Sequence, residues 1–285
     1  MFNQLRRKHK LNCDLREVCK DIRCDIMTCI GHLGNGHIGG CLSVVELLAV
    51  LYYEEMNIDP ANPKMPGRDR FVCSKGHAGP AVYSTLANRG YFDRKELLTL
   101  NVGGTNLPSH CDMNRTIGID MTTGSLGQGF SCAVGVALGS KLDEDGATVY
   151  TLIGDGETQE GQIWEAAMFA AAKKLDNLIG FTDYNKLQID GTVEEVNSIA
   201  PLDAKWAAFG WNVINVTDGN DVDQVLAAVR MAKANRTSGK PTMIILNTLK
   251  GCGVSFIEAM GAANHNTNMT EEDAARAVAE IRGEK

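Results

Sequence analysis

Residues 154–191 read GDGETQEGQIWEAAMFAAAKKLDNLIGFTDYNKLQIDG, and this stretch decides the fold. It follows a short apolar run rich in β-branched residues, Thr148 to Ile153, which predicts a buried strand. The apolar spacing that comes next predicts a helix from about Gln162 to Lys174. A second short apolar run, Leu178 to Thr182, predicts another strand. The order of strand, helix and strand is typical of a parallel sheet.

Polar side chains follow both of these strands. Asp155 lies between Gly154 and Gly156, where small residues allow backbone amides to approach an anion and a helix N-terminus follows. Asn185 follows the second strand, so it comes close to Asp155 if the two strands are parallel neighbours. Mg2+ prefers oxygen ligands and commonly takes one or two carboxylates together with phosphate oxygens. The stretch therefore predicts a diphosphate that Mg2+ bridges to the protein.

The rest of the chain continues the alternation of strands and helices. The expected fold class is α/β, a parallel sheet covered by helices on both faces, with ligands at the carboxyl ends of the strands. The helix over 130–142 is rich in glycine and alanine, which suits close packing against a neighbour. Ser43 and Glu46 have the spacing of a capping box, as do Thr270 and Asp273. The remaining expected elements are helices over 11–33, 43–55, 78–89, 201–209, 221–234 and 270–282 and strands over 211–215 and 242–248.

The composition is that of an ordinary globular protein. The chain has 285 residues, of which 44% are apolar and 22% charged, and its net charge is −7. This charge argues against a nucleic-acid surface, and we expect the basic cluster at residues 6–10 to be a solvated terminus. No apolar h-region follows that cluster, and no window of 18 apolar residues occurs, so neither a secretory signal nor a membrane span is predicted.

The number and spacing of the cysteines indicate the redox environment of the protein. The chain has nine cysteines, an odd number, and no CxxC pair, so a zinc site is not expected. Many thiols without a secretion signal are typical of a reducing environment. We therefore expect a cytoplasmic protein.

Four of the six histidines follow glycine or lie in polar loops: His37, His77, His110 and His265. A single loop histidine is more often a surface residue than a catalytic one. These four, however, lie in or beside segments that resemble one family in order and spacing. The segments are GHIGG, RDRFVCSKGHAGPAVYS, LPSH, TTGSLGQG, GDGETQEG, IDG and KGCGVSF. From about residue 15 to 270 the chain resembles the N-terminal, diphosphate-binding half of transketolase.

The resemblance implies thiamine diphosphate as the cofactor, with Mg2+ or else Ca2+ or Mn2+. Asp155 and Asn185 match the side-chain ligands of the metal, and Leu187 matches the position that provides a backbone carbonyl. Gly154 and Gly156 match the turn that holds the diphosphate. The cofactor would provide a carbanion that attacks a ketose carbonyl and an electron sink for the carbanion formed afterwards.

Further cofactor contacts are implied in the same way. His77 matches a histidine beside the diphosphate, and Gly124 and Leu126 match positions that touch the cofactor. Glu160 matches a glutamate in a carboxylate network that crosses the dimer interface.

The catalytic residues implied by the resemblance are three histidines. His37 and His110 match those that contact the carbonyl and hydroxyls of the donor sugar. His265 matches the last histidine of the active site, although many transketolases read Trp-His-Gly where this chain has Asn264-His265-Asn266. Imidazoles can donate hydrogen bonds to a developing alkoxide and transfer protons near neutral pH.

We expect one domain, 1–285, that binds the diphosphate end of the cofactor, with the pyrimidine-binding and C-terminal domains in a separate subunit. The expected assembly is A2B2, and the expected reaction transfers a two-carbon ketol unit from a ketose phosphate donor to an aldose phosphate acceptor. Alternatives are a branched or sulfonated ketose donor, a 1-deoxyxylulose-5-phosphate synthase and an inactive cofactor-binding paralogue. The alpha subunit of a 2-oxo-acid dehydrogenase also has a GDG motif, but the other motifs are not found there.

Overall fold

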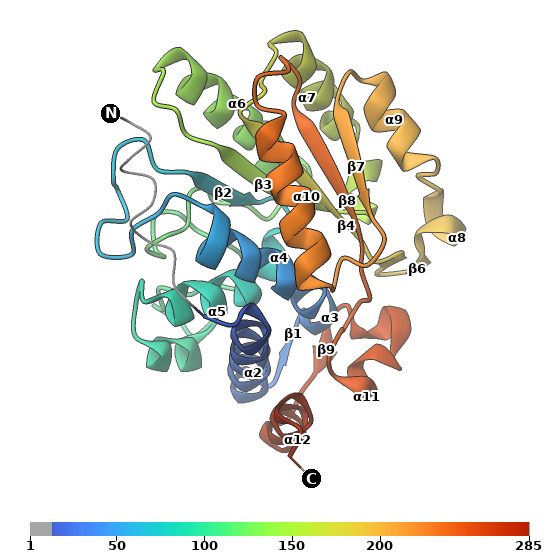
Figure 1. Ribbon diagram of the computed structural model, residues 1–285. Coiled ribbons are helices and arrows are strands. Elements are labelled where there is room, and N and C mark those ends of the chain that lie inside the picture. Colours follow the sequence, from blue (N-terminus) through green and yellow to red (C-terminus); the bar gives the residue numbers. More distant parts are fainter. Residues whose placement is uncertain (1–12, 285) are drawn as a thin grey trace.

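The structure, a computed structural model, describes residues 13–284 (Figure 1). The basic cluster at residues 6–10 lies outside the described residues. The centre of the molecule is a sheet of five parallel strands in the order β2-β3-β4-β8-β7. The strands are β2 (Arg70–Cys73), β3 (Val149–Gly154), β4 (Leu178–Tyr184), β8 (Thr242–Asn247) and β7 (Asn212–Val216).

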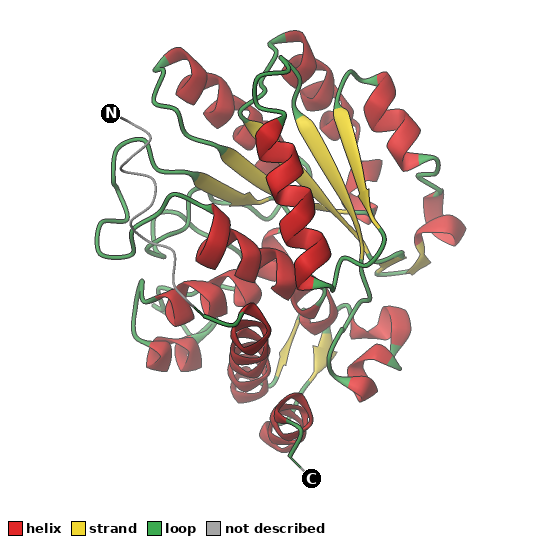
Figure 2. Cartoon of the chain, viewed as in Figure 1, coloured by secondary structure: helices red, strands yellow, loops and turns green. Residues whose placement is uncertain are grey.

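Helices cover both faces of this sheet, as predicted (Figures 1 and 2). One face carries α10, with α4, α2 and α5 packed beyond it, and the other face carries α6, α7 and α9. These helices are α2 (Leu15–Leu33), α4 (Val45–Val50), α5 (Gly79–Arg89), α6 (Gln128–Leu142), α7 (Gly161–Ala172), α9 (Leu202–Ala208) and α10 (Val222–Ala234). The C-terminal helix α12 (Glu271–Arg282) packs against α2 at the bottom of the view in Figure 1.

The sequence of the strands explains the two layers. Successive side chains of a strand point to opposite faces, so a strand that is apolar throughout is buried on both sides. In β3, Tyr150 and Leu152 belong to the core under α10, whereas Val149 and Ile153 belong to the core under α6 and α7. The buried face predicted for the helix after β3 is also confirmed, since Ile163, Ala166, Ala167, Ala170 and Leu175 are all buried.

Short elements complete the fold around the carboxyl ends of the strands. They are β1 (Asn35–Gly36), which pairs with β9 (Thr267–Asn268), β5 (Leu187–Gln188), which pairs with β6 (Gly191–Thr192), and the helices α3 (Ile38–Leu42), α8 (Val193–Asn197) and α11 (Ser255–Glu258). A π-helical turn, Leu51–Glu55, extends α4, and 3₁₀ turns occur at Gly76–Ala78, Arg94–Thr99, Gly156–Gln159 and Gly261–Asn264.

One predicted cap is wrong and another is confirmed. The Ser43 hydroxyl donates to the carboxylate of Asp183 at 2.7 Å, and Glu46 forms a buried ion pair with Arg23. Neither side chain is left to cap the helix, because distant partners outcompete the local pattern. The capping box of Thr270 and Asp273 is present at the start of α12, where Thr270 is exposed and the second carboxylate oxygen of Asp273 pairs only with Arg276 one turn away.

The expected meeting of Asp155 and Asn185 is also confirmed. Strands β3 and β4 are parallel neighbours, and Gly154 lies opposite Asp183. Both strands therefore end at the same edge of the sheet. None of the helices over residues 13–284 is long and apolar enough to cross a membrane.

Candidate active site

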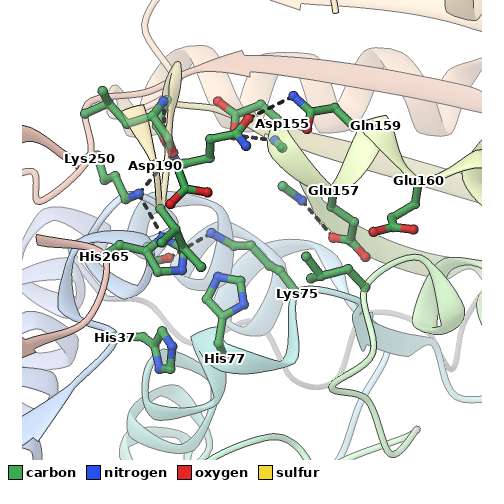
Figure 3. A pocket seen from close by; sticks show the side chains of 18 of the residues that line it. His37, Lys75, His77, Asp155, Glu157, Gln159, Glu160, Asp190, Lys250 and His265 are labelled. Carbon is green, nitrogen blue, oxygen red and sulfur yellow. Dashed lines mark hydrogen bonds between the residues drawn. The ribbon is translucent and has the colours of Figure 1, made fainter. Parts of the chain in front are cut away.

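A cavity of about 380 Å³ opens at the carboxyl ends of β3 and β4 (Figure 3). Its walls come from the loops after β2, β3, β4 and β8, from the segment before α6, and from α3 and the residue before it. All of the site residues expected from the sequence line it: His37, His77, His110, Gly124, Leu126, Gly154, Asp155, Gly156, Glu160, Asn185, Leu187 and His265. Segments from residue 37 to residue 265 are thus brought together in one place.

The expected metal ligands form one rim of this cavity. Asp155 is 3% exposed and accepts hydrogen bonds from the backbone amides of Gly156 and Lys186. The side-chain oxygen of Asn185 accepts from the amide of Leu187 at 3.1 Å. The carbonyl oxygen of Leu187 accepts from the ammonium of Lys250 at 3.0 Å.

The chemistry of these donors fits a hard divalent cation. A carboxylate, an amide oxygen and a backbone carbonyl are all oxygen ligands, as Mg2+ requires. Burial, followed by the nearby Asp183 carboxylate, raises the pKa of Asp155 to about 7. A buried carboxyl group with such a pKa is poorly compensated in the protein alone, and a bound cation would supply the missing charge.

Asp183 lies beneath this rim and joins four segments of the chain. Its carboxylate accepts from Lys75 at 2.6 Å, from Ser43 at 2.7 Å, from the amide nitrogen of Asn185 at 2.9 Å and from the hydroxyl of Thr248. The bond from Asn185 keeps its amide nitrogen toward Asp183, so the amide oxygen of Asn185 points away from Asp183. We refer to these five residues as the Asp183 hub.

The hub contains a fully buried ion pair. Lys75 and Asp183 have side chains that are 2% and 0% exposed. Burial alone would raise the pKa of Asp183, but the Lys75 ammonium outweighs it and holds that pKa below its usual value. Burial likewise opposes the charge on Lys75, and the Asp183 carboxylate outweighs it and raises the lysine pKa. Both groups are therefore ionised at neutral pH.

Glu157 fixes the loop on the other side of the cavity. This buried carboxylate accepts from the hydroxyl of Ser74 and from the backbone amides of Gly127 and Gly154. Three loops that line the cavity are therefore tied to one side chain. Glu160, in contrast, is exposed, so it can reach a partner.

Four histidines line another wall of the cavity: His37, His77 and His265, which are labelled in Figure 3, and His110. The ring centre of His37 lies 5.1 Å from that of His77, 5.8 Å from that of His110 and 5.5 Å from that of His265. The rings of His77 and His265 are 5.2 Å apart. We call these four side chains the histidine wall.

The histidine wall is uncharged at neutral pH. Burial lowers the pKa of His37, His77 and His110 below the ordinary value, and Lys75 adds to this effect at His77. Burial and the nearby Lys250 lower the pKa of His265 to about 3. Neutral imidazoles each have one N–H donor and one acceptor nitrogen, so the wall can bind hydroxyl and carbonyl groups in either direction.

Lys250 lies between the histidine wall and the expected metal ligands. Its ammonium lies 3.0 Å from Nδ1 of His265 and 3.0 Å from the carbonyl oxygen of Leu187. Burial, followed by the nearby Lys75, lowers the pKa of Lys250 to about 8. An ammonium that donates to Nδ1 leaves the proton of the neutral ring on Nε2 of His265.

Among the polar residues of the site that sequence reasoning missed are Lys75, Glu157, Asp183 and Lys250. Each stands within or beside a quoted motif, in SKGH, GDGETQEG, FTDYN or KGCG. For Lys75, Glu157 and Lys250 the available signal was a charged residue next to glycine, and for Asp183 it was a charged residue at the end of an apolar run. Charge in such places is exposed unless it has a buried partner.

The fold and the site define a class of protein: an α/β domain with a ligand cavity at the carboxyl ends of parallel strands. The oxygen donors of this cavity suit a cation and a diphosphate, and its neutral histidines suit a polyhydroxylated substrate. A family model described as "Transketolase, thiamine diphosphate binding domain" matches residues 15–283. The chain belongs to the transketolase family of transferases and carries its thiamine diphosphate binding domain.

Individual relatives support this assignment. The chain is 57% identical over 271 residues to the 6-deoxy-6-sulfo-D-fructose transketolase subunit SqwG of Clostridium sp. (strain MSTE9), covering 95% of this chain and 97% of the relative. It is 41% identical over 247 residues to an apulose-4-phosphate transketolase subunit of Phocaeicola vulgatus, covering 86% of each chain.

A solved structure shows the same fold. The transketolase from Leishmania mexicana matches with a TM-score of 0.88 and 31% identity over 96% of this chain. The match covers 42% of that longer protein, so the present chain spans about two fifths of it.

Proposed function

We propose that this chain is the diphosphate-binding subunit of a two-chain transketolase that transfers a two-carbon ketol unit from a ketose to an aldose. One observation carries the proposal: a single cavity joins the oxygen donors of Asp155, Asn185 and Leu187 to a wall of four neutral histidines. The first part suits a cation and a diphosphate, and the second suits a ketose. The names of the relatives, which are subunits of similar length, support a second chain.

The roles proposed for the residues follow from this geometry. Asp155, Asn185 and the Leu187 carbonyl hold Mg2+, while Gly154, Gly156, Gly124, Leu126 and His77 contact the cofactor. When bound there, thiamine diphosphate would supply a carbon nucleophile and an electron sink.

The histidine wall binds the substrate and exchanges protons with it. His37, His110 and His265 donate to the carbonyl and hydroxyl oxygens of the ketose and exchange protons with them. Because their pKa values are low, the neutral forms act at physiological pH, and a proton accepted by one ring is readily released again.

The partner is proposed to cover the α6 and α7 side of the molecule. Leu142 on α6 and Met168 and Phe169 on α7 are 74%, 58% and 43% exposed. Gly135 and Gly139 on α6 have open space where a Cβ atom would lie, so another backbone can approach closely. The exposed Glu160 and Ile189 at the cavity rim would be covered by the same partner, in an A2B2 assembly with a pyrimidine-binding chain.

A specific observation favours a sulfonated ketose over a ketose phosphate as the donor. The relative that is 57% identical is named for 6-deoxy-6-sulfo-D-fructose, whereas the apulose-4-phosphate relative is 41% identical and the rat transketolase 36%. All nine cysteines lie within the described residues and are free thiols, in keeping with the reducing cytoplasm that we propose as the compartment.

The test is a ketol-transfer assay with thiamine diphosphate and Mg2+, run on this chain alone and with a separately produced pyrimidine-binding chain of the same organism. The donors are 6-deoxy-6-sulfofructose and xylulose 5-phosphate, and the acceptors are glyceraldehyde 3-phosphate and ribose 5-phosphate. We expect activity only in the mixture, with the sulfonated donor leaving a four-carbon sulfonated aldose. Absence of transfer from both donors in a mixture that binds the cofactor would refute the proposal.

A further inference from the structure

Asn264 occupies a position that sequence reasoning noted only because it departs from the family pattern. Its side chain is 0% exposed, although asparagine is rarely buried completely. Its amide nitrogen donates to the carbonyl oxygen of Lys250 at 3.2 Å and to that of Ile257 at 3.0 Å. These two carbonyls require a donor, so the orientation of the amide is determined by its surroundings.

The same side chain is fitted against α3. A Cβ atom at Gly39 would lie 2.0 Å from the amide oxygen of Asn264, so this contact excludes any other residue at position 39 unless Asn264 moves. The backbone amide of Gly251 donates to the carbonyl of Gly39 at 3.1 Å. Asn264 therefore lies where α3, the loop after β8 and α11 meet.

Two active-site groups are attached directly to this junction. Lys250 is held through its carbonyl, and His265 follows Asn264 in the chain. The ammonium of Lys250 and Nδ1 of His265 are 3.0 Å apart, so a shift in either backbone segment would break their contact. On the other side of Asn264, Gly39 is only two residues from His37.

Retaining this amide costs free energy. The amide oxygen of Asn264 is buried and has no hydrogen-bond partner among residues 13–284. A buried acceptor without a partner is destabilising relative to an apolar group of the same shape. Stability alone therefore does not explain an asparagine at position 264. The need for a fixed N–H donor to the carbonyl of Lys250 does explain it.

We infer that Asn264 is a positioning residue, which sets the distance between Lys250 and His265. Through this distance it determines how tightly the histidine wall binds the donor sugar. The inference rests on the proposed function in so far as the wall binds a ketose. The contact between Lys250 and His265 can, however, be measured whether or not the chain supports ketol transfer.

The variants are chosen to separate positioning from stability. Asn264→Asp keeps the volume but removes the N–H donors, and Asn264→Ser is smaller but keeps one donor. Asn177→Asp is the matched control, because Asn177 is also buried, donates to the carbonyl of Ala137 at 2.9 Å and has an unpartnered amide oxygen at the opposite end of β4. Gly39→Ala, on α3, places a methyl group against the amide oxygen of Asn264 and so displaces that side chain.

The first readout is kinetic and uses the assembled two-chain enzyme. We expect Asn264→Asp and Gly39→Ala to raise the KM for the donor at least tenfold while kcat changes less than threefold. Asn264→Ser should recover part of the loss. Asn177→Asp should lower the melting temperature as much as Asn264→Asp does and leave the donor KM unchanged. If the donor KM of Asn264→Asp is unchanged, or rises no more than that of Asn177→Asp, the inference is wrong.

The second readout is independent of ketol transfer. Diethyl pyrocarbonate modifies unprotonated imidazole nitrogens, and in the wild-type chain Lys250 occupies Nδ1 of His265. We expect His265 to react at least threefold faster in Asn264→Asp, measured by peptide mass spectrometry against the exposed His32 as internal reference. If the wild-type assembly shows no ketol transfer, the proposed function fails, and this rate alone decides the positioning role. Equal rates in the wild-type and variant chains would overturn it.

Discussion

Replacing Asp183 by asparagine would test whether the Asp183 hub holds the expected metal ligand Asn185 in place. The change keeps the shape of the side chain but leaves the Lys75 ammonium, 2% exposed, without its counter-ion. Breaking a buried ion pair in this way costs about 3–5 kcal/mol. A chain of 285 residues unfolds with an entropy of about 0.6 kcal/mol per kelvin, so the melting temperature should fall by about 5–8 °C.

A second effect concerns the cation. The amide nitrogen of Asn185 donates to Asp183 at 2.9 Å, and this bond directs the amide oxygen. Loss of a partner that orients a metal ligand typically weakens metal binding by about 10–100-fold. We therefore expect Asp183→Asn to weaken Mg2+-dependent binding of thiamine diphosphate by that factor, measured by calorimetry below the melting transition.

The control is Glu46→Gln, which breaks the ion pair of Arg23 and Glu46. These side chains are 8% and 6% exposed, and neither lines the cavity. A similar loss of stability is expected, with unchanged cofactor affinity. The double variant Lys75→Met/Asp183→Leu removes both charges, so it should regain stability but not affinity. Normal affinity in Asp183→Asn would refute the argument that the hub orients Asn185.

Three further predictions concern single groups of the site. Asp155→Ala should abolish Mg2+-dependent cofactor binding in calorimetry, and normal affinity would reject Asp155 as a metal ligand. His110→Ala should slow turnover of the assembled enzyme while the cofactor still binds, and unchanged steady-state kinetics would remove His110 from the mechanism. The pKa of Asp155 is raised from 3.8 to about 7, so the folded chain binds this proton more tightly than the unfolded chain does. The metal-free chain should therefore lose up to about 4 kcal/mol of stability as the pH rises from 4 to 8, relative to Asp155→Asn, and denaturant melts with equal pH dependence in both chains would contradict this.

The sequence was a good guide wherever a local pattern had no competitor. The apolar runs around residues 148–153 and 178–182 became β3 and β4, and their parallel pairing follows from the helix between them. Thr270 caps α12 as its spacing predicted, because no distant side chain takes either partner of the capping box away from the helix start. Ser43 has the same type of spacing, but its hydroxyl bonds to Asp183, 140 residues away, and no local rule includes that partner.

The site residues divide in the same way. Those in motifs with a known order, such as Asp155 and Asn185, were found from the sequence and line the cavity. Lys75 and Lys250 were not, because a lysine beside glycine in a loop is normally solvated and only the fold shows its buried partners. Asn264 is a similar case, since its importance depends on Gly39, a residue in a different segment.

The Asp183 hub also has a consequence for how the chain acquires its cofactor during synthesis. Its bonds connect Asp183 with residues 140 and 108 positions earlier and 65 positions later. Contacts of such long range form late in folding, because the loops between them must close first. Thr248 follows β8, which inserts between β4 and β7, so the hub cannot be complete before the ribosome has made nearly nine tenths of the chain. We therefore expect the chain to bind its cofactor only after this part of the domain has been translated and folded.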